Sequence, residues 1–155
     1  VTINPYLGRD SAEPFLQYAD KGIVILCRTS NAGAREFQDL VVDGRKLYQI
    51  VAESVARDWN SRGNCLLVVG ATYPEELADI RARTGDMTFL VPGVGAQGGD
   101  VEKAVRNGRT AGGEGLVINS SRGIIYAGSG EDFAVAAGHA TLELRDAINA
   151  ALKMN

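Results

Sequence analysis

The stretch that decides the fold is Met87-Thr88-Phe89-Leu90-Val91, followed directly by Pro92-Gly93-Val94-Gly95-Ala96-Gln97-Gly98-Gly99-Asp100. The short apolar run predicts a buried strand. The four glycines after it let the backbone approach a ligand closely and point several N–H groups at one anion. Asp100 is expected to cap the helix that follows. This stretch therefore predicts a strand, a ligand-binding loop and a helix in succession.

The same alternation of strand and helix recurs along the whole chain. Five apolar runs predict strands buried on both faces, as in a parallel sheet: Val1–Ile3, Gly22–Cys27, Cys65–Val69, Met87–Val91 and Gly115–Ile118. The clearest helical signal between them is the apolar stripe formed by Leu47, Ile50, Val51, Val55 and Trp59. Thr72 and Glu75 predict a capping box, with Pro74 in the first turn of its helix. Further helices are expected at about Ser11–Ala19, at Asp100–Arg109 and around Leu144–Leu152.

Strand–helix alternation predicts a parallel sheet with right-handed crossovers, which fits a doubly wound sheet or a (β/α)₈ barrel. No Gly-x-Gly-x-x-Gly follows the first strand, which argues against a dinucleotide fold. Glycine-rich and Arg-bearing turns instead follow the fourth and fifth strands, as after strands 7 and 8 of phosphate-binding barrels. We therefore expect an α/β fold. The chain 1–155 would be units 4 to 8 of a single TIM-barrel domain, with the N-terminal units missing.

Polar side chains follow the strand ends, where barrels place their chemistry. Arg122 comes after two serines, and a guanidinium beside hydroxyls suits a phosphate dianion. A short helix at Ile124–Ala127 is expected to complete that site. Gln97 offers an amide to a phosphate or a base. Ser30 fits a turn about as well as it fits a pocket, whereas Asn4 before Pro5 indicates a turn first and a pocket residue second.

The strand-end residues include no Lys or His and no carboxylate before Asp100, although general acid–base chemistry normally needs one of these groups. The only positively charged residues at the predicted strand ends are Arg28 and Arg122. We therefore expect this part of the molecule to hold a ligand and another part to transform it.

Composition excludes several classes of protein. A net charge of −3 argues against a nucleic-acid groove, and no apolar run approaches the roughly 18 residues of a membrane span. Cys27 and Cys65 lie singly in apolar runs, which indicates buried, reduced thiols in a cytoplasmic protein. His139, the only histidine, falls in the predicted last helix and is expected to be structural. No cluster of metal ligands is evident.

Four segments together resemble the orotidine 5′-monophosphate decarboxylase family, particularly its bacterial subgroup with a long chain. They are Val1-Thr2-Ile3-Asn4-Pro5-Tyr6-Leu7-Gly8, Arg28-Thr29-Ser30-Asn31, Pro92–Asp100 and Asn119-Ser120-Ser121-Arg122. The resemblance implies a homodimeric lyase without metal or cofactor that converts orotidine monophosphate to UMP. It implies that Ser30 contacts the pyrimidine, that Gln97 bridges pyrimidine and phosphate, and that Arg122 and the backbone of Ser121 bind phosphate. Pro92 is the remaining substrate-binding candidate.

The chain departs from the family in lacking the Asp-x-Lys-x-x-Asp signature, whose Lys protonates C6 of the substrate. No catalytic residue is therefore assigned within it. One alternative is another sugar-phosphate barrel enzyme, such as a metal-dependent keto-sugar-phosphate decarboxylase or an epimerase. The other is a non-catalytic phosphate-binding half-barrel.

Overall fold

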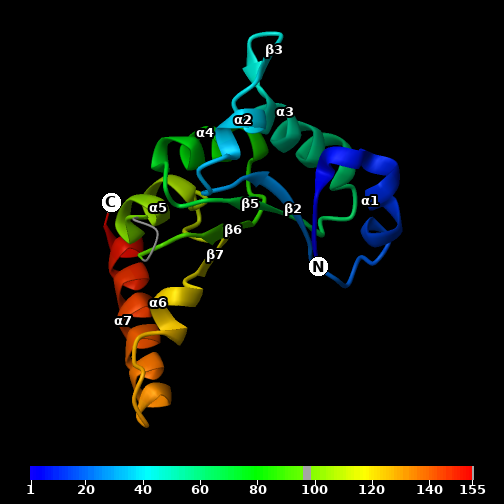
Figure 1. Cartoon of the computed structure of the whole chain (residues 1–155). Helices are drawn as coiled ribbons and strands as arrows, with labels where there is room; N and C mark the ends of the chain where they lie inside the picture. Colours follow the sequence, from blue (N-terminus) through cyan, green and yellow to red (C-terminus); the bar gives the residue numbers. More distant parts are fainter. Residues whose placement is uncertain (96–98, 155) are drawn as a thin grey trace.

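The computed structural model describes residues 1–95 and 99–154. Its centre is a five-stranded sheet in the order β1 (Thr2–Ile3), β2 (Ile23–Arg28), β5 (Cys65–Val69), β6 (Phe89–Pro92) and β7 (Leu116–Asn119). Every pairing in this sheet is parallel. The five predicted strands and their parallel arrangement are confirmed. Because the order in the sheet is the order in the chain, the strands progress in one direction, as they do in a barrel (Figure 1).

The helices lie along one face of this sheet (Figure 1). The elements on this face are α1 (Arg9–Leu16), α3 (Leu47–Ser54) with its π-helical continuation Val55–Trp59, α4 (Pro74–Thr84) and α5 (Val101–Gly108). Strand residues that point toward these helices form the core, including Ile25, Leu67 and Phe89, each 0% exposed. The helices therefore cover the convex side of a curved sheet, as the outer layer of a barrel does.

The opposite face of the sheet is only partly covered. Val24, Leu66 and Leu90 are half-buried, and Val117 is 48% exposed. The expectation of strands buried on both faces is therefore wrong for this chain by itself. In a closed barrel this face lines the interior, and burying it requires the strands that complete the circle.

The capping box predicted at Thr72 and Glu75 is also wrong. Helix α4 begins at Pro74 with Tyr73 as its N-cap, and no side chain caps it. The start lies one residue later than predicted, so Glu76 rather than Glu75 occupies the third helical position. The Glu76 carboxylate instead accepts hydrogen bonds from Arg28 at 2.6 and 2.9 Å. The glutamate at the third position of α4 therefore forms a tertiary ion pair with Arg28 and does not cap its own helix.

Between β2 and α3 the chain forms α2 (Ala34–Gln38) and a small hairpin, β3 (Val41–Val42) and β4 (Arg45–Lys46). Its turn is Asp43-Gly44, with φ of 50° and 75°. An Asp-Gly pair is the usual signal for such a turn because both central residues need positive φ. The hairpin was not predicted, although this signal is present in the sequence.

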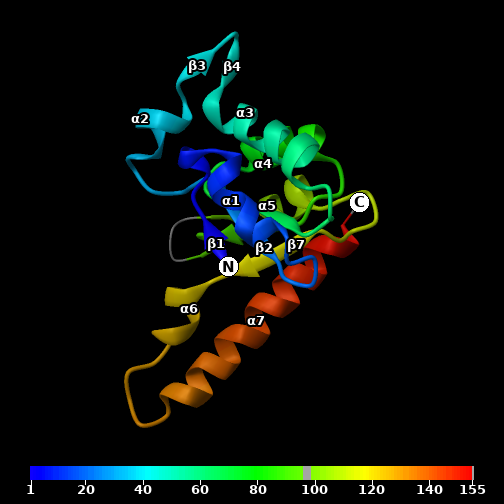
Figure 2. The same cartoon turned by 90° about the vertical axis from the view of Figure 1, so that its right-hand side faces the viewer.

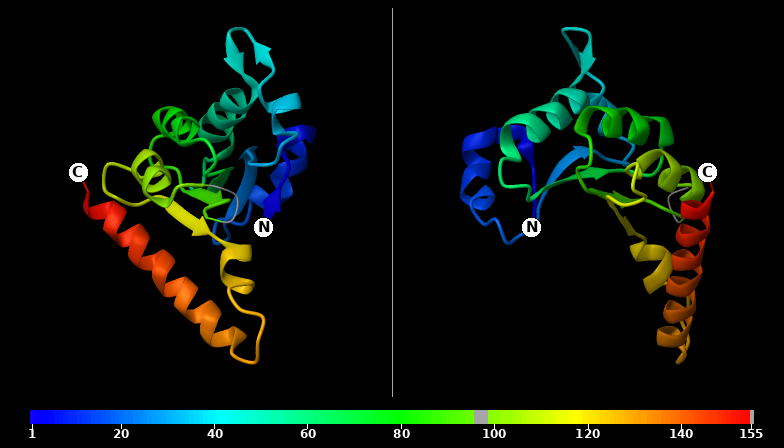
Figure 3. Two further views of the ribbon diagram at one scale, coloured as in Figure 1. Left: turned by 60° about the vertical axis from the view of Figure 1, so that its left-hand side comes forward. Right: turned by 180° about the vertical axis from the view of Figure 1, so that it is seen from behind.

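The last two helices leave the body of the molecule. Helix α6 (Ser121–Ile125) follows β7, and α7 (Phe133–Lys153) runs back beside it toward α5 (Figures 2 and 3). The C-terminal end of α7 is held where Arg109 donates to the carbonyl oxygen of Leu152 at 2.8 Å. Along the rest of α7, Phe133 and Val135 are more than half exposed. Much of the apolar surface of α7 therefore has no covering partner within the described residues.

Candidate functional site

The carboxyl ends of three strands surround an open hollow of about 470 Å³, lined by Ser30, Asn31, Pro92 and Arg122. Ser30 and Asn31 follow β2, Pro92 ends β6, and Arg122 lies just after β7. Parallel strands bring their carboxyl ends to one edge, which is why residues far apart in sequence meet here. The structure thus brings together three of the five residues proposed from the sequence.

Ser30 forms one wall of the hollow against β5. Its hydroxyl oxygen is buried and has no hydrogen-bond partner among the described residues. The backbone beyond β5 lies so close that a Cβ at Gly70 would overlap the Ser30 hydroxyl. Leaving a buried hydroxyl unpaired costs roughly 1–3 kcal/mol, a cost that a ligand oxygen or nitrogen can remove. This geometry favours a polar ligand group at Ser30.

The glycine-rich loop closes on itself at its base. Gly95 N–H donates to the carbonyl oxygen of Gly99 at 3.0 Å, and Gly99 N–H donates to that of Gly93 at 3.2 Å. A Cβ at Gly99 would lie 2.6 Å from the Gly93 oxygen and 2.7 Å from Cβ of Ala71, so a larger residue does not fit there. Asp100 caps α5, as predicted, by accepting a hydrogen bond from Lys103 N–H at 3.1 Å. Gln97 lies outside the described residues.

On the far side of the hollow, β7 leads directly into α6. The helix occupies Ser121–Ile125 rather than the predicted Ile124–Ala127, so Arg122 lies in its first turn. The hydroxyl of Ser121 donates to Asn119 Oδ1 at 3.0 Å, and Ser121 is not among the lining residues. The hydroxyl of Ser120 donates to the carbonyl oxygen of Val94 at 3.3 Å, which ties this turn to the glycine loop. Arg122 is exposed and lines the hollow.

Arg28, the other arginine counted at the strand ends, does not line the hollow. The pairing of β2 with β5 shifts between Leu26 and Arg28, which is a β-bulge. The bulge turns the Arg28 side chain into the layer of helices, where it is 2% exposed and pairs with Glu76 and Asp39. Burial lowers the pKa of Arg28, but the hydrogen bond and charge of Glu76 outweigh it and keep the guanidinium charged.

Cys27, Cys65, Asn4 and His139 are not among the residues that line the hollow. Burial raises the pKa of Cys27 to about 12 and that of Cys65 to about 11, so both are neutral free thiols, as predicted. Asn4 is a turn residue whose Oδ1 accepts from Tyr6 N–H at 3.0 Å. His139 is exposed on α7.

Within residues 1–95 and 99–154, no three His, Cys, Asp or Glu side chains gather as metal ligands would. In the same part of the chain, no helix is both long and apolar enough to cross a bilayer.

The sequence-based search did not single out Asn31, although it lines the hollow beside Ser30. Its position immediately after Ser30 at the end of a buried strand was the available signal. Gly70, which sets how close Ser30 comes to β5, carried no such signal, because a strand-end glycine is common in turns.

Comparison with known proteins places this chain in a family. A family model described as Orotidine 5′-phosphate decarboxylase / HUMPS family matches residues 1–137. The chain belongs to this family. An orotidine 5′-phosphate decarboxylase from Azoarcus sp. (strain BH72) is 63% identical over 150 residues, which cover 97% of this chain and 56% of that protein. The Janthinobacterium sp. (strain Marseille) enzyme of the same name is 58% identical over 149 residues, covering 96% of this chain and 55% of that protein.

Solved structures agree with the sequence comparisons. Leishmania donovani OMP decarboxylase superposes with a TM-score of 0.82 at 41% identity, covering 96% of this chain and 56% of that one. L. donovani UMP synthase superposes with a TM-score of 0.83 at 46% identity, covering 95% of this chain and 32% of that one. The chain therefore has the fold of part of a TIM barrel. It spans about half the length of the curated relatives that it matches.

Proposed function

We propose that this chain supplies the phosphate- and pyrimidine-binding part of an orotidine 5′-phosphate decarboxylase, which forms UMP in pyrimidine biosynthesis. The observation that carries the proposal is the hollow lined by Ser30, Asn31, Pro92 and Arg122 at the carboxyl edge of the sheet. It combines a cationic group at one side with a buried, unpaired hydroxyl at the other. A nucleotide has the matching pair of ends, a phosphate dianion and a base with polar edges.

In this proposal Arg122 binds the phosphate of orotidine monophosphate and of UMP, helped by the backbone N–H of Ser121. Ser30 contacts the pyrimidine, and Pro92 forms the apolar wall between the two ends. Gln97 bridges pyrimidine and phosphate. Contacts with a phosphate far from the reacting carbon raise catalytic efficiency when their energy is realised in the transition state.

The groups that act at C6 belong to the front of the barrel. The lysines of this chain are Lys21, Lys46, Lys103 and Lys153. None of them lies in the residues directly after the carboxyl end of a strand of the large sheet. The half-exposed inner face of the sheet and its two edge strands, β1 and β7, are the surfaces that three further βα units would cover. The proposed whole is one TIM-barrel domain.

We further propose that the complete enzyme is a cytoplasmic homodimer that needs no metal or cofactor. The separate buried thiols support a reducing compartment. Decarboxylation through a carbanion stabilised by a neighbouring Lys needs electrostatic stabilisation rather than an electron-accepting cofactor.

Complementation tests the proposed function. A separate polypeptide that carries the first three βα units of an orotidine 5′-phosphate decarboxylase, including the family's Asp-x-Lys-x-x-Asp motif, is prepared and mixed with Val1–Asn155. Loss of orotidine monophosphate absorbance is followed for the mixture and for each part alone. We expect activity only in the mixture, and none when the Lys of the added motif is replaced by Ala. Turnover by Val1–Asn155 alone would contradict the proposal.

The metal-dependent alternative is tested in the same mixture. Activity that survives EDTA supports the decarboxylase proposed here. No loss of orotidine monophosphate, together with Mg²⁺-dependent turnover of a keto-sugar phosphate by the same mixture, favours a keto-sugar-phosphate decarboxylase or an epimerase. A mixture that binds UMP without turnover favours the non-catalytic half-barrel.

A further inference from the structure

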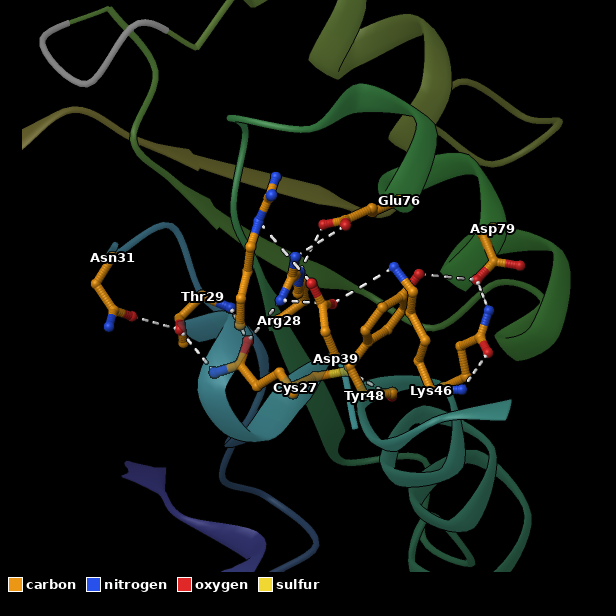
Figure 4. Close-up of polar contacts among 12 residues, drawn as sticks. Cys27, Arg28, Thr29, Asn31, Asp39, Lys46, Tyr48, Glu76 and Asp79 are labelled. Carbon is orange, nitrogen blue, oxygen red and sulfur yellow. Dashed lines mark hydrogen bonds and ion pairs between the residues drawn. The ribbon is translucent and has the colours of Figure 1, made fainter. Parts of the chain in front are cut away.

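A cluster of charged side chains around Arg28 is linked by hydrogen bonds to the turn that carries Ser30 and Asn31, two of the residues that line the hollow (Figure 4). The guanidinium of Arg28 donates through Nε and Nη2 to both carboxylate oxygens of Glu76, at 2.6 and 2.9 Å. Its Nη1 lies 3.3 Å from Asp39, and its planar group faces the ring of Tyr48 at 5.2 Å. With partners from three other elements around it, the position of Arg28 is closely determined.

Gln38 connects this cluster with the end of β2. Its Oε1 accepts hydrogen bonds from Arg28 Nη1 at 3.4 Å and from the backbone N–H of Thr29 at 3.0 Å. Both partners can only donate, so Oε1 must face them and Nε2 must face the other way. Nε2 then donates to the hydroxyl oxygen of Thr29 at 2.8 Å.

The chain of hydrogen bonds continues from Gln38 through Thr29 to Asn31, which lines the hollow. Because the Thr29 oxygen already accepts from Gln38, its hydroxyl hydrogen is free to donate, and it donates to Asn31 Oδ1 at 2.6 Å. This contact commits Oδ1 of Asn31 and leaves its Nδ2 as the group available to a ligand (Figure 4). Ser30 lies between the two residues that this chain of hydrogen bonds holds.

We propose that Arg28 is a positioning residue that acts through Gln38 and Thr29. It fixes the Ser30–Asn31 turn and makes Asn31 a hydrogen-bond donor at the base end of the nucleotide site. This inference rests on the proposed function and goes beyond it, because it assigns Asn31 a contact with an acceptor oxygen of the pyrimidine. Such a donor suits the carbonyl oxygens of uracil and orotate. It disfavours an amino group at the same position.

The cluster serves only one end of the site. Arg122, at the phosphate end, follows β7, whereas the Arg28 cluster is built from β2, α2, α3 and α4. No described hydrogen bond joins the two groups. A substitution that breaks the hydrogen bonds between Arg28, Gln38, Thr29 and Asn31 should therefore weaken binding of the base and leave binding of the phosphate unchanged.

Two variants interrupt the hydrogen-bond chain with little change in shape. Thr29→Val removes the hydroxyl. Gln38→Glu places an acceptor where Nε2 donated, so the Thr29 hydroxyl turns toward it and abandons Asn31. Thr29→Ser retains the hydroxyl and is the conservative rescue. Thr141→Val removes a hydroxyl that donates to Ala137 on the exposed face of α7, and it controls for the substitution itself.

The experiment measures dissociation constants for UMP and for ribose 5-phosphate by calorimetry. The protein is a fused barrel, with the front part of the Azoarcus relative joined ahead of Val1. We expect Thr29→Val and Gln38→Glu to weaken UMP binding about tenfold, the typical effect of one lost hydrogen bond to a ligand. Ribose 5-phosphate should bind equally to all forms. Thr29→Ser and Thr141→Val should bind UMP as the unchanged protein does.

Three other results overturn the inference. Equal weakening toward both ligands means that the cluster only supports the fold, and no change toward UMP means that Asn31 does not contact the base. If the unchanged fused barrel binds ribose 5-phosphate but not UMP, the proposed function fails and this inference falls with it.

Discussion

The backbone of Gly70 lies directly against the hydroxyl of Ser30, with no room for a side chain between them. The contact joins the residue after β5 to the base end of the hollow after β2. It explains why the Ser30 hydroxyl is buried while its turn is otherwise at the surface.

Gly70→Ala should therefore displace Ser30 and weaken UMP binding by the fused barrel about tenfold, since one ligand hydrogen bond is lost. Calorimetric titration with UMP measures this. Gly112→Ala is the matched control, because a Cβ there meets only Thr110 Oγ1 at 3.8 Å. Unchanged UMP affinity in Gly70→Ala would show that Ser30 is not a ligand contact.

Arg122→Ala should lower kcat/KM for orotidine monophosphate on the order of a hundredfold, because a charge-assisted contact with the phosphate is lost. Turnover of orotidine, which has no phosphate, should barely change. Steady-state kinetics of the fused barrel with both substrates provide the measurement. Arg106→Ala removes an exposed arginine paired with Glu102 and should leave both rates unaltered. Equal losses toward both substrates would assign Arg122 a structural role.

Glu76→Ala should destabilise the protein by about 3–5 kcal/mol, because it leaves the buried guanidinium of Arg28 without its main partner. Glu75→Ala changes the neighbouring, exposed carboxylate on the same turn of α4 and should cost less than about 0.5 kcal/mol. Urea unfolding of the two fused variants compares them directly. Similar midpoints for both would mean that the ion pair contributes little.

Stability should fall as the pH rises above about 8.5, the ordinary pKa of a thiol in an unfolded chain. Burial raises the pKa of Cys27 to about 12, so above pH 8.5 the unfolded state loses a proton that the folded state keeps. The free energy of unfolding then decreases by up to about 1.4 kcal/mol per pH unit for this thiol. Urea unfolding between pH 8 and 10 should give a shallower decline in Cys27→Ala than in the unchanged protein. Parallel declines would contradict the prediction.

Sequence reasoning succeeded where local pattern and tertiary environment agree. The apolar runs at Cys65–Val69 and Met87–Val91 predicted strands correctly, because both lie in the centre of the sheet. Asp100 was correctly predicted to cap a helix, because α5 begins directly after it. The sequence did not indicate where the Arg28 side chain lies, because the bulge that turns it toward α4 depends on the register with β5. Sequence reasoning failed for the α4 cap because the helix begins at Pro74, one residue later than the Thr72–Glu75 pattern predicts. The glutamate at its third position, Glu76, pairs with Arg28, 48 residues away. Long-range partners of this kind leave no local pattern in a sequence.

The order β1-β2-β5-β6-β7 has a consequence for how the molecule is made. Each described strand of the sheet pairs only with the strands next to it in this series, so none of these pairings needs a strand from outside the series. During synthesis the sheet can grow at one edge as the chain emerges, with the order of translation equal to the order of assembly. The ion pair between Arg28 and Glu76 can form only after α4 has been synthesised, although β2 is made earlier. The side chain of Arg28 therefore reaches its final partners later than its strand is made.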